Sequence, residues 1–245
     1  MQSPAVQKAS RGEQPRLPRC QRNGEFPRLV VGVSNGDDSF HLMPEIFNYV
    51  EEYQLPCIVL TDKNVAEGLF MQEPYDCSKT ELRRGALVTD PQELKALSCN
   101  DRYDTTSDNG VSKRWLPGAE AETWCAQGDE HDEDGCVDES ADNAIAQMDK
   151  RMRKMDALRS VLPDPEFFSV SDGVVISSEN AEMDTLIVSW GSNRGPIIDV
   201  LPELGPSVGY LHFTYLWPLK TERFLELVSM AKRTILVEGN YQGQL

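Results

Sequence analysis

The chain ends in the stretch TILVEGNYQGQL, residues 234–245, and this stretch decides the fold. Its apolar part, residues 234–237, is typical of a buried parallel strand. A carboxylate, two glycines, an Asn and two Gln follow directly, where an α/β sheet carries its functional loops. Because no helix pattern follows to cover the strand, we expect the sheet to be a piece of a larger structure.

Two more strand patterns precede this last strand, at residues 185–190 (TLIVSW) and 208–213 (VGYLHF). A helix with Pro196 at its first position separates them, and a helix capped by Thr221 leads to the last strand. The order strand, helix, strand, helix, strand predicts an α/β layer with parallel strands.

A further strand–helix–strand unit lies near the start of the chain. Residues 29–33 and 57–60 predict strands, and residues 40–53 predict the helix between them. Such a unit requires a parallel pair of strands joined by a right-handed crossover. Cys57, inside the second strand, is interpreted as a small core residue.

The middle of the chain differs, because regular periodicity is lost over residues 69–140, where Pro, Gly, Asn and Asp recur. Residues 129–142 hold eight acidic residues and no basic one. A structureless stretch of this length is improbable inside a compact domain. We expect it to wrap over a partner surface or to link two domains.

An amphipathic helix is predicted for residues 142–160. Ile145, Met148, Met152 and Met155 recur at helical spacing and make one adaptable apolar stripe. The stripe is either an ordinary core face or a subunit interface.

Composition narrows the class of protein. A net charge of −16 over 245 residues repels nucleic acid and anionic membranes. No apolar run is long enough to span a bilayer, and residues 1–22 lack the apolar core of a secretory signal, so we expect a cytoplasmic protein. Residues 1–27, rich in Pro, Arg and Gln, predict a disordered arm.

The six cysteines predict free thiols rather than a metal centre. None lies closer than 11 residues to the next, whereas structural zinc and iron–sulfur sites need tightly spaced thiolates. We therefore expect no metal site, and in a cytoplasmic chain no disulfide framework.

Two charged clusters are candidate sites. Arg83 and Arg84 could pair with an acidic surface or a substrate carboxylate, or they could form a solvated pair. Glu130, His131 and Asp132, followed by two more acids, could ligate a divalent cation. Their spacing is not that of an EF-hand, which favours a solvated acidic loop.

Two further candidates follow predicted strands. Trp190 and Gly191 lie between a strand and a helix, in a turn that either binds an anion through backbone N–H groups or is only structural. Glu238, Asn240 and Gln244 lie beyond the last strand and either contact a ligand or form an exposed end.

Eight stretches between residues 23 and 245 stand out as motifs: NGEFPR (23–28), EYQLPCIVLTD (52–62), RRG (83–85), DNGVSKRWLPG (108–118), EHDEDG (130–135), KRMRK (150–154), SWGS (189–192) and VEGNYQGQL (237–245). In this order they resemble the C-terminal part of the alpha subunit of 2-oxoacid:ferredoxin oxidoreductases, closest to the 2-oxoglutarate type.

The resemblance implies a particular domain order. Residues 28–69 would be the end of a pyrimidine-binding-type parallel α/β domain. Residues 70–165 would be an irregular linker with an acidic loop and an amphipathic helix. Residues 166–245 would be a transketolase-C-terminal-like α/β domain, truncated at its end.

The resemblance also implies a thiamine-diphosphate enzyme that decarboxylates a 2-oxoacid, reduces ferredoxin and makes acyl-CoA. A beta subunit would supply the diphosphate and magnesium site, and the parent complex would contain an iron–sulfur cluster. In the family the activating glutamate lies upstream of residue 23, so no catalytic residue is carried over.

We therefore expect a fragment that binds none of these cofactors alone, or alternatively a non-catalytic module that binds the beta subunit. The candidate interface residues are Arg84, Glu130, His131, Asp132, Met148, Met152, Met155, Trp190, Gly191, Glu238, Asn240 and Gln244.

Overall fold

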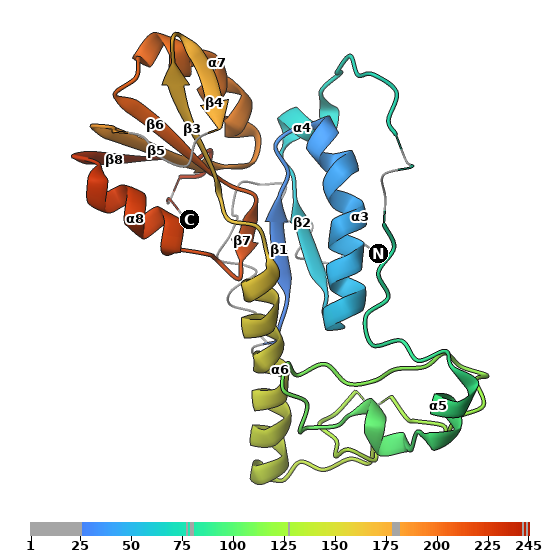
Figure 1. Cartoon of the computed structure of the whole chain (residues 1–245). Helices are drawn as coiled ribbons and strands as arrows, with labels where there is room; N and C mark the ends of the chain where they lie inside the picture. The colour runs from blue at the N-terminus through green and yellow to red at the C-terminus, as the bar shows by residue number, and fades with distance from the viewer. Residues whose placement is uncertain are drawn as a thin grey trace. The chain divides into compact units, whose positions relative to one another are not determined.

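A computed structural model describes residues 26–76, 78, 81–126, 128–177, 182–241, 243 and 245 (Figure 1). Most of the predicted disordered arm, together with Cys20, Cys77 and the candidate residue Gln244, lies outside the described residues. None of the described helices is long and apolar enough to cross a membrane.

The chain divides into two compact units. The first unit comprises Met1–Met43, Cys57–Lys79 and Leu162–Leu245, and therefore joins the two α/β segments that the resemblance assigns to separate domains. The second unit comprises Pro44–Pro56 and Thr80–Val161. The boundary between the units falls within helix α3, Gly36–Tyr53, so this one helix contributes to both.

A five-stranded sheet dominates the first unit, in the order β4-β3-β6-β5-β8. Its strands are β3 (Glu166–Ser171), β4 (Val174–Ser177), β5 (Thr185–Trp190), β6 (Val208–Phe213) and β8 (Arg233–Val237). Strand β5 runs parallel to β6 and β8, as the sequence predicts, whereas β3 is antiparallel to both β4 and β6. The α/β fold class is therefore confirmed, with a mixed sheet.

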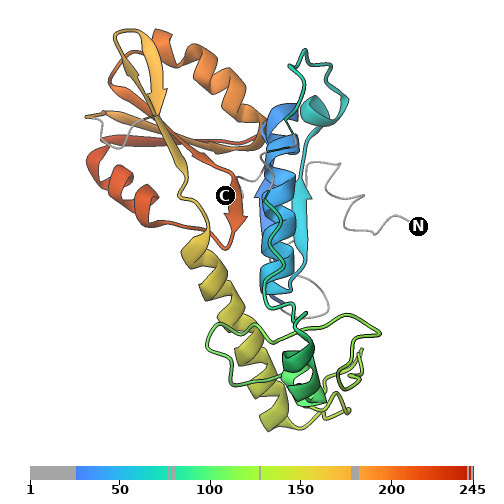
Figure 2. The same ribbon diagram turned by 45° about the vertical axis from the view of Figure 1, so that its right-hand side comes forward.

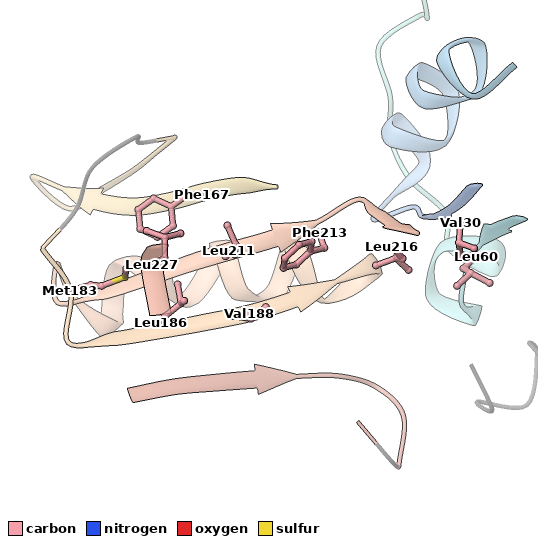
Figure 3. Close-up of a cluster of buried hydrophobic side chains, with 10 residues drawn as sticks. All are labelled: Val30, Leu60, Phe167, Met183, Leu186, Val188, Leu211, Phe213, Leu216 and Leu227. Carbon is pink, nitrogen blue, oxygen red and sulfur yellow. The ribbon is translucent and has the colours of Figure 1, made fainter. Parts of the chain in front are cut away.

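Helices α7 (Arg194–Leu204) and α8 (Glu222–Met230) lie on this sheet (Figures 1 and 2). Ile197 and Leu201 of α7 pack with Ile187 of β5, whereas Leu227 of α8 packs with Leu186. Because successive side chains of a strand point to opposite faces, the two helices cover opposite faces of the sheet. Figure 3 shows the cluster on the α8 side.

Strand β8 corrects one prediction, because the run 234–237 is parallel but not buried. It occupies the edge of the sheet and pairs only with β5 among the described strands. Ile235 and Leu236 are therefore 37% and 45% exposed. A continuous apolar run predicts a strand in the middle of a sheet, buried on both faces of the sheet. An edge strand instead lacks a neighbouring strand along one of its edges, which leaves its side chains more exposed.

A three-stranded sheet, in the order β2-β1-β7, completes the first unit. Strands β1 (Leu29–Gly32) and β2 (Cys57–Leu60) are parallel and joined through α3, as predicted. Helix α4 (Lys63–Glu67) follows β2. Strand β7 (Tyr215–Trp217) pairs antiparallel with β1, so a segment near the C-terminus extends the N-terminal sheet. Cys57 is partly buried, and burial raises the pKa of its thiol to about 12, in agreement with a packing role.

The second unit contains α5 (Pro91–Ala96), η2 (Cys99–Arg102), α6 (Ala141–Val161) and the later part of α3. Residues 80–161, in the region where we expected a linker, contribute a hydrophobic cluster of Val88, Leu94, Leu97 and Trp115. Short side chains hold the irregular backbone around it; for example, Asp90 accepts hydrogen bonds from the N–H groups of Gln92 and Glu93.

Helix α6 has nearly the predicted length, but the side of the helix that is buried is not the side of the predicted apolar stripe. Its buried side carries Gln147, Lys150, Lys154, Met155 and Leu158, whereas Ile145 is 60% exposed, and Met148 and Met152 are half-buried. Only Met155 of the predicted stripe therefore lies in the core. The interpretation of the stripe as an ordinary core face is wrong for Ile145. Polar side chains of α6 bind carbonyl groups instead: Arg153 donates to Ser107 in the preceding loop, and Lys154 donates to Gln54, just after α3.

Candidate functional site

The segments that follow β1, β2, β5 and β8 form a polar rim at the carboxyl ends of the parallel strands of the first unit. This is where α/β sheets carry their ligands. After β5, the hydroxyl of Ser192 donates to the carboxylate of Asp62, which follows β2 and also caps α4. The amide of Asn193 donates to the carbonyl of Val237, at the end of β8, over 3.5 Å.

Trp190 and Gly191, predicted as a turn between strand and helix, are placed as predicted. Trp190 ends β5, and Gly191 begins the short helix η3 (Gly191–Asn193). The Trp190 ring lies against Gly32 of β1, where an added Cβ would be 2.8 Å from ring atom Cε3. The indole Nε1 is buried with no hydrogen-bond partner among the described residues. Trp190 therefore packs β5 against β1.

Glu238 and Asn240, beyond β8, bond to their own segment. The Glu238 carboxylate accepts hydrogen bonds from the Asn240 amide and, over 2.6 Å, from the backbone N–H of Leu245. The Asn240 side-chain oxygen accepts from the N–H of Gly243 over 2.7 Å. In this conformation both side chains stabilise a turn.

Sequence reasoning missed a buried polar chain behind the rim. The Ser34 hydroxyl lies 3.0 Å from Nε2 of His212, whose Nδ1 lies 2.8 Å from the Tyr210 hydroxyl. That hydroxyl in turn lies 2.7 Å from the hydroxyl of Ser189. Tyr210 and His212 are two positions apart in β6, so their side chains point to the same face of the sheet. A buried His within the apolar run 208–213 was the sequence signal that could have revealed this chain.

Ser34, His212 and Tyr210 are arranged like a nucleophile, its base and the residue that orients the base, but their pKa values do not suit these roles. His212 is fully buried, and its burial, together with the nearby Arg194, lowers its pKa to about 3. Burial also raises the pKa of Tyr210, so its phenol stays neutral. A base this weak does not take the Ser34 proton at neutral pH. The chain therefore joins the end of β1 to β5 and β6 as a structural tie.

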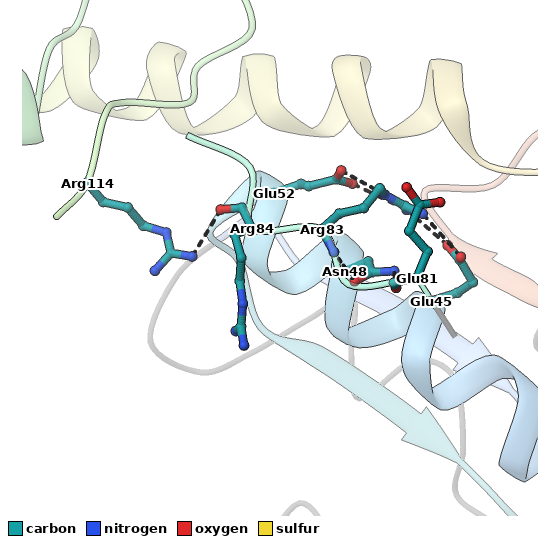
Figure 4. Close-up of polar contacts among 7 residues, drawn as sticks. All are labelled: Glu45, Asn48, Glu52, Glu81, Arg83, Arg84 and Arg114. Atoms are coloured by element: carbon teal, nitrogen blue, oxygen red, sulfur yellow. Dashed lines mark hydrogen bonds and ion pairs between the residues drawn. The ribbon is translucent and has the colours of Figure 1, made fainter. Parts of the chain in front are cut away.

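In the second unit, Arg83 clamps the segment before it onto α3 (Figure 4). Its guanidinium donates to both oxygens of Glu45, over 3.1 and 2.9 Å, and its Nε donates to Glu52 over 2.8 Å. The buried Asn48 accepts from the N–H of Arg83 and donates to the carbonyl of Glu81. The carboxylates that Arg83 binds therefore belong to its own chain.

Arg84 faces solvent, and its side chain is 60% exposed. Its nearest carboxylate is Glu51, at 3.5 Å, which also receives the guanidinium of Arg114. Arg114 additionally donates to the carbonyl of Arg84 over 3.1 Å. Two cations therefore share one carboxylate, and Arg84 is the one that remains accessible to a partner.

The acidic loop is folded against α6 and the segment around Tyr103. Glu130 pairs with Arg151, the His131 ring lies 4.2 Å from the Tyr103 ring, and Asp132 accepts from the N–H of Cys136. Within the described residues, no group of three His, Cys, Asp or Glu side chains could hold a metal ion. Glu130 and Asp132 thus serve a local ion pair and a local hydrogen bond.

Comparison with known proteins identifies relatives of the chain. A 2-oxoacid:ferredoxin oxidoreductase alpha subunit from Aeropyrum pernix is 32% identical over 227 residues, which are 91% of this chain and 33% of that protein. One from Sulfurisphaera tokodaii is 29% identical over 225 residues. The chain spans about a third of the length of these curated relatives. No family model matches it.

A solved structure has the same fold. It is a 2-oxoglutarate:ferredoxin oxidoreductase from Magnetococcus marinus with 2-oxoglutarate, coenzyme A and succinyl-CoA bound. The match has a TM-score of 0.77 and 25% identity, and covers 95% of this chain and 39% of that one. Over nine tenths of its length, this chain is therefore a homologue of one third of the alpha subunit of 2-oxoacid:ferredoxin oxidoreductases.

Proposed function

We propose that the chain is part of the alpha subunit of a cytoplasmic, thiamine-diphosphate-dependent enzyme that oxidises 2-oxoglutarate to an acyl-CoA and reduces ferredoxin. The observation that carries this proposal is the fold match over 95% of the chain to a 2-oxoglutarate:ferredoxin oxidoreductase. The identities of about 30% to alpha subunits support the same assignment.

Within that enzyme, this chain supplies packing and assembly rather than reacting groups. The charged side chains of the candidate site are engaged by their own chain, and the buried His212 is too weak a base. The domain order is proposed as the resemblance implies it, with residues 28–69, 70–165 and 166–245 as successive segments.

An iron–sulfur cluster needs several thiolates close together, but no group of three His, Cys, Asp or Glu side chains that could hold a metal lies in the described part of the chain. We propose, as the resemblance implies, that the diphosphate and magnesium site belongs to the beta subunit and that the iron–sulfur cluster lies elsewhere in the complex.

The candidate interface residues divide by exposure. Met155, Trp190 and Gly191 are packed inside their units and act through the fold. Arg84 and Ile145 are exposed, and the half-buried Met148 and Met152 continue the stripe of Ile145 along α6. A partly exposed apolar stripe on a helix is typical of a protein interface. We propose that Arg84 and this stripe meet the beta subunit, with Glu130, His131 and Asp132 close to the contact.

Reconstitution tests the proposal. The chain is mixed with a cognate beta subunit, thiamine diphosphate, magnesium, coenzyme A and 2-oxoglutarate, and viologen reduction is followed alongside complex formation by size-exclusion chromatography. We expect a stable complex without turnover, because the family's activating glutamate matches no residue between 23 and 245. Turnover above that of the beta subunit alone would overturn this account, and absence of a complex would refute the interface.

A matched pair of variants locates the contact on α6. Ile145→Asp places a charge on the outward stripe, whereas Ala146→Asp places the same charge on an exposed neighbour to one side of it. We expect only Ile145→Asp to weaken the complex, by tenfold or more. A complex without turnover is also what the alternative function predicts, namely a module that binds the beta subunit without supporting catalysis.

A further inference from the structure

An apolar segment of the first unit, residues 68–76, follows α4 and lies at the surface (Figure 1). Leu69 and Met71 are fully exposed, Phe70 is 51% exposed and Tyr75 is 39% exposed. Single apolar side chains on a surface are ordinary, but here four large ones fall within seven residues. A cluster of this kind is typical of a surface that another molecule covers.

Tyr75 holds this segment against the start of α3. Its ring stacks on the Phe40 ring, with the centroids 3.9 Å apart and the planes at 9° to one another. Its hydroxyl donates to the carbonyl of Gly36 over 3.2 Å, and the Gln72 amide donates to the Asp37 carboxylate over 3.0 Å. The segment therefore follows a defined path and displays its side chains from an anchored backbone.

Phe70 lies against glycines of the same region. A Cβ on Gly68 would be 2.6 Å from ring atom Cζ of Phe70, and a Cβ on Gly36 would be 3.6 Å from ring atom Cδ2. Gly68 therefore leaves the space that this ring occupies. Leu69 and Met71, the neighbours of Phe70 in the sequence, leave their whole side chains to solvent.

Acidic residues accompany these apolar side chains. Residues 36–41 and 61–76 contain one Lys, one His and six acids, namely Asp37, Asp38, Asp62, Glu67, Glu73 and Asp76. The one Lys, Lys63, is paired with Glu67 over 3.6 Å. Glu73 is exposed and follows Met71 by two residues. The charge of this surface opposes nucleic acid and anionic lipid and favours a cationic partner.

We propose that residues 68–76, together with the first turns of α3, form a docking surface for a protein segment in which apolar side chains alternate with Arg or Lys. Its apolar side chains pack on Leu69 and Met71, and its cations face Glu73 and Asp37. This surface belongs to the first unit, whereas the stripe of α6 belongs to the second. The contact is therefore tested independently of the one proposed with the beta subunit.

Peptide binding tests the proposal on the full chain. The probe is a short fluorescein-labelled peptide in which Leu and Arg alternate, and its binding is followed by fluorescence anisotropy. Two control peptides replace every Arg by Glu or every Leu by Ser. We expect the probe to bind at least tenfold more tightly than either control, and more weakly at high salt, which screens the charged part of the contact. A control peptide that binds equally well, or a probe that does not bind, would overturn the proposal.

A double variant, Leu69→Ser with Met71→Ser, removes the apolar part of the surface without removing a packed side chain. We expect it to weaken binding of the probe by tenfold or more. Leu225→Ser, at a 60% exposed position of α8, is the matched control and should bind the probe as the wild type does. Thermal melting verifies that both variants are folded. Equal losses of affinity would show that the probe binds exposed apolar groups in general, contrary to the proposal.

Charge variants distinguish a local site from attraction to the whole acidic chain. Glu73→Lys and Glu203→Lys change the net charge equally, but Glu203 is an exposed residue of α7. We expect only Glu73→Lys to weaken binding, at least several-fold, and equal losses would refute a local site. Size-exclusion chromatography at rising protein concentration tests for a second copy as the occupant. A dimer that disappears in the double variant would assign the surface to self-association and overturn the proposal.

Discussion

At the scale of single residues, Arg83 and Arg84 are chemically identical neighbours with different environments. Arg83 is 30% exposed and binds two carboxylates of α3 with good geometry, whereas Arg84 is 60% exposed and has one distant carboxylate. The sequence predicts a charged pair that binds a carboxylate, but not that Glu45 and Glu52, more than 30 positions away, would be the partners of Arg83. Such long-range pairing leaves no local pattern.

We predict that Arg83→Met destabilises the second unit by about 2 kcal/mol, because charge-assisted hydrogen bonds are lost and two carboxylates are left without their cation. Arg84→Met, the matched control, should cost less than about 1 kcal/mol, as is typical of exposed ion pairs. Urea unfolding of both variants measures the difference. Equal losses would mean that the clamp on α3 does not form in solution.

His212 gives the first unit a pH dependence. Its pKa is about 3 in the folded chain, because burial and Arg194 oppose its charge, against an ordinary value of 6.5. Below pH 6.5 the unfolded chain therefore binds a proton that the folded chain does not. Stability is then lost as pH falls toward 3, by up to about 1.4 kcal/mol per pH unit.

The measurement is the urea midpoint at pH 7 and pH 5 for the wild type and for His212→Gln, which cannot titrate. We expect a smaller fall for the variant, whatever its stability at pH 7. A slope unchanged in His212→Gln would show that this residue is not buried as a neutral group.

At the scale of elements, strands with continuous apolar runs are predicted best. The bounds of β2, β5 and β6 agree with the sequence to the residue. In β5 and β6 the reason is burial on both faces, which requires an unbroken apolar sequence. The hairpin β3–β4 was missed, although its turn, Asp172-Gly173, has positive φ at both residues, and Asp-Gly between apolar runs is a strong hairpin signal. Strand β7 is only three residues long and has no pattern of its own.

Helix α6 shows why periodicity can mislead. The spacing of Ile145, Met148 and Met152 marks one side of a helix but does not say which side the unit covers. The unit covers the side with Lys150 and Lys154, whose long stems fill space while Lys154 donates to the carbonyl of Gln54 over 3.3 Å. Burial of polar side chains depends on such carbonyl partners, which the sequence of a helix does not reveal.

The buried lysines predict a rise of stability at alkaline pH. Burial and neighbouring cations lower the pKa of Lys150 and of Lys154 to about 8, against 10.5 in the unfolded chain. Between pH 8 and 10.5 the unfolded chain holds more protons, so the second unit becomes more stable as pH rises.

Lys150→Met tests this assignment, because Lys150 is 5% exposed and its ammonium faces the Tyr103 ring, 6.0 Å from the ring centroid. We expect the variant to melt several degrees higher at pH 7 and to show a weaker rise toward pH 10. Lys154→Met, its matched partner, also removes the donor to Gln54 and should bring no gain at pH 7. A lower melting temperature for Lys150→Met would mean that its ammonium reaches an anion or solvent.

At the scale of the whole molecule, homology and charge give different information. Over nine tenths of its length the chain is similar to a third of the alpha subunits of 2-oxoacid:ferredoxin oxidoreductases, and the mixed α/β fold agrees. The candidate site was only partly predictable from the sequence. The rim residues could be predicted because they follow the ends of predicted strands. The hydrogen-bonded groups Ser34, His212, Tyr210 and Ser189 could not, because their contacts depend on the packing of the two sheets. Net charge, in contrast, affects the stability of the whole chain.

The excess of acidic residues predicts that salt stabilises the chain. Forty acidic residues face 24 basic ones, and folding brings the excess negative charge together. Ion pairs such as Glu130–Arg151 offset only part of this repulsion, and salt weakens exposed pairs by less than it relieves a net charge of −16. The Debye length falls from about 30 Å at 0.01 M salt to about 3 Å at 1 M. We therefore expect the melting temperature to rise by several degrees, with most of the gain below about 0.5 M.

Sucrose at matched osmolality should not reproduce that early rise, because it leaves the repulsion unscreened. A melting temperature that is flat over the same range of salt would mean that the acidic residues lie too far apart in the folded chain to repel one another.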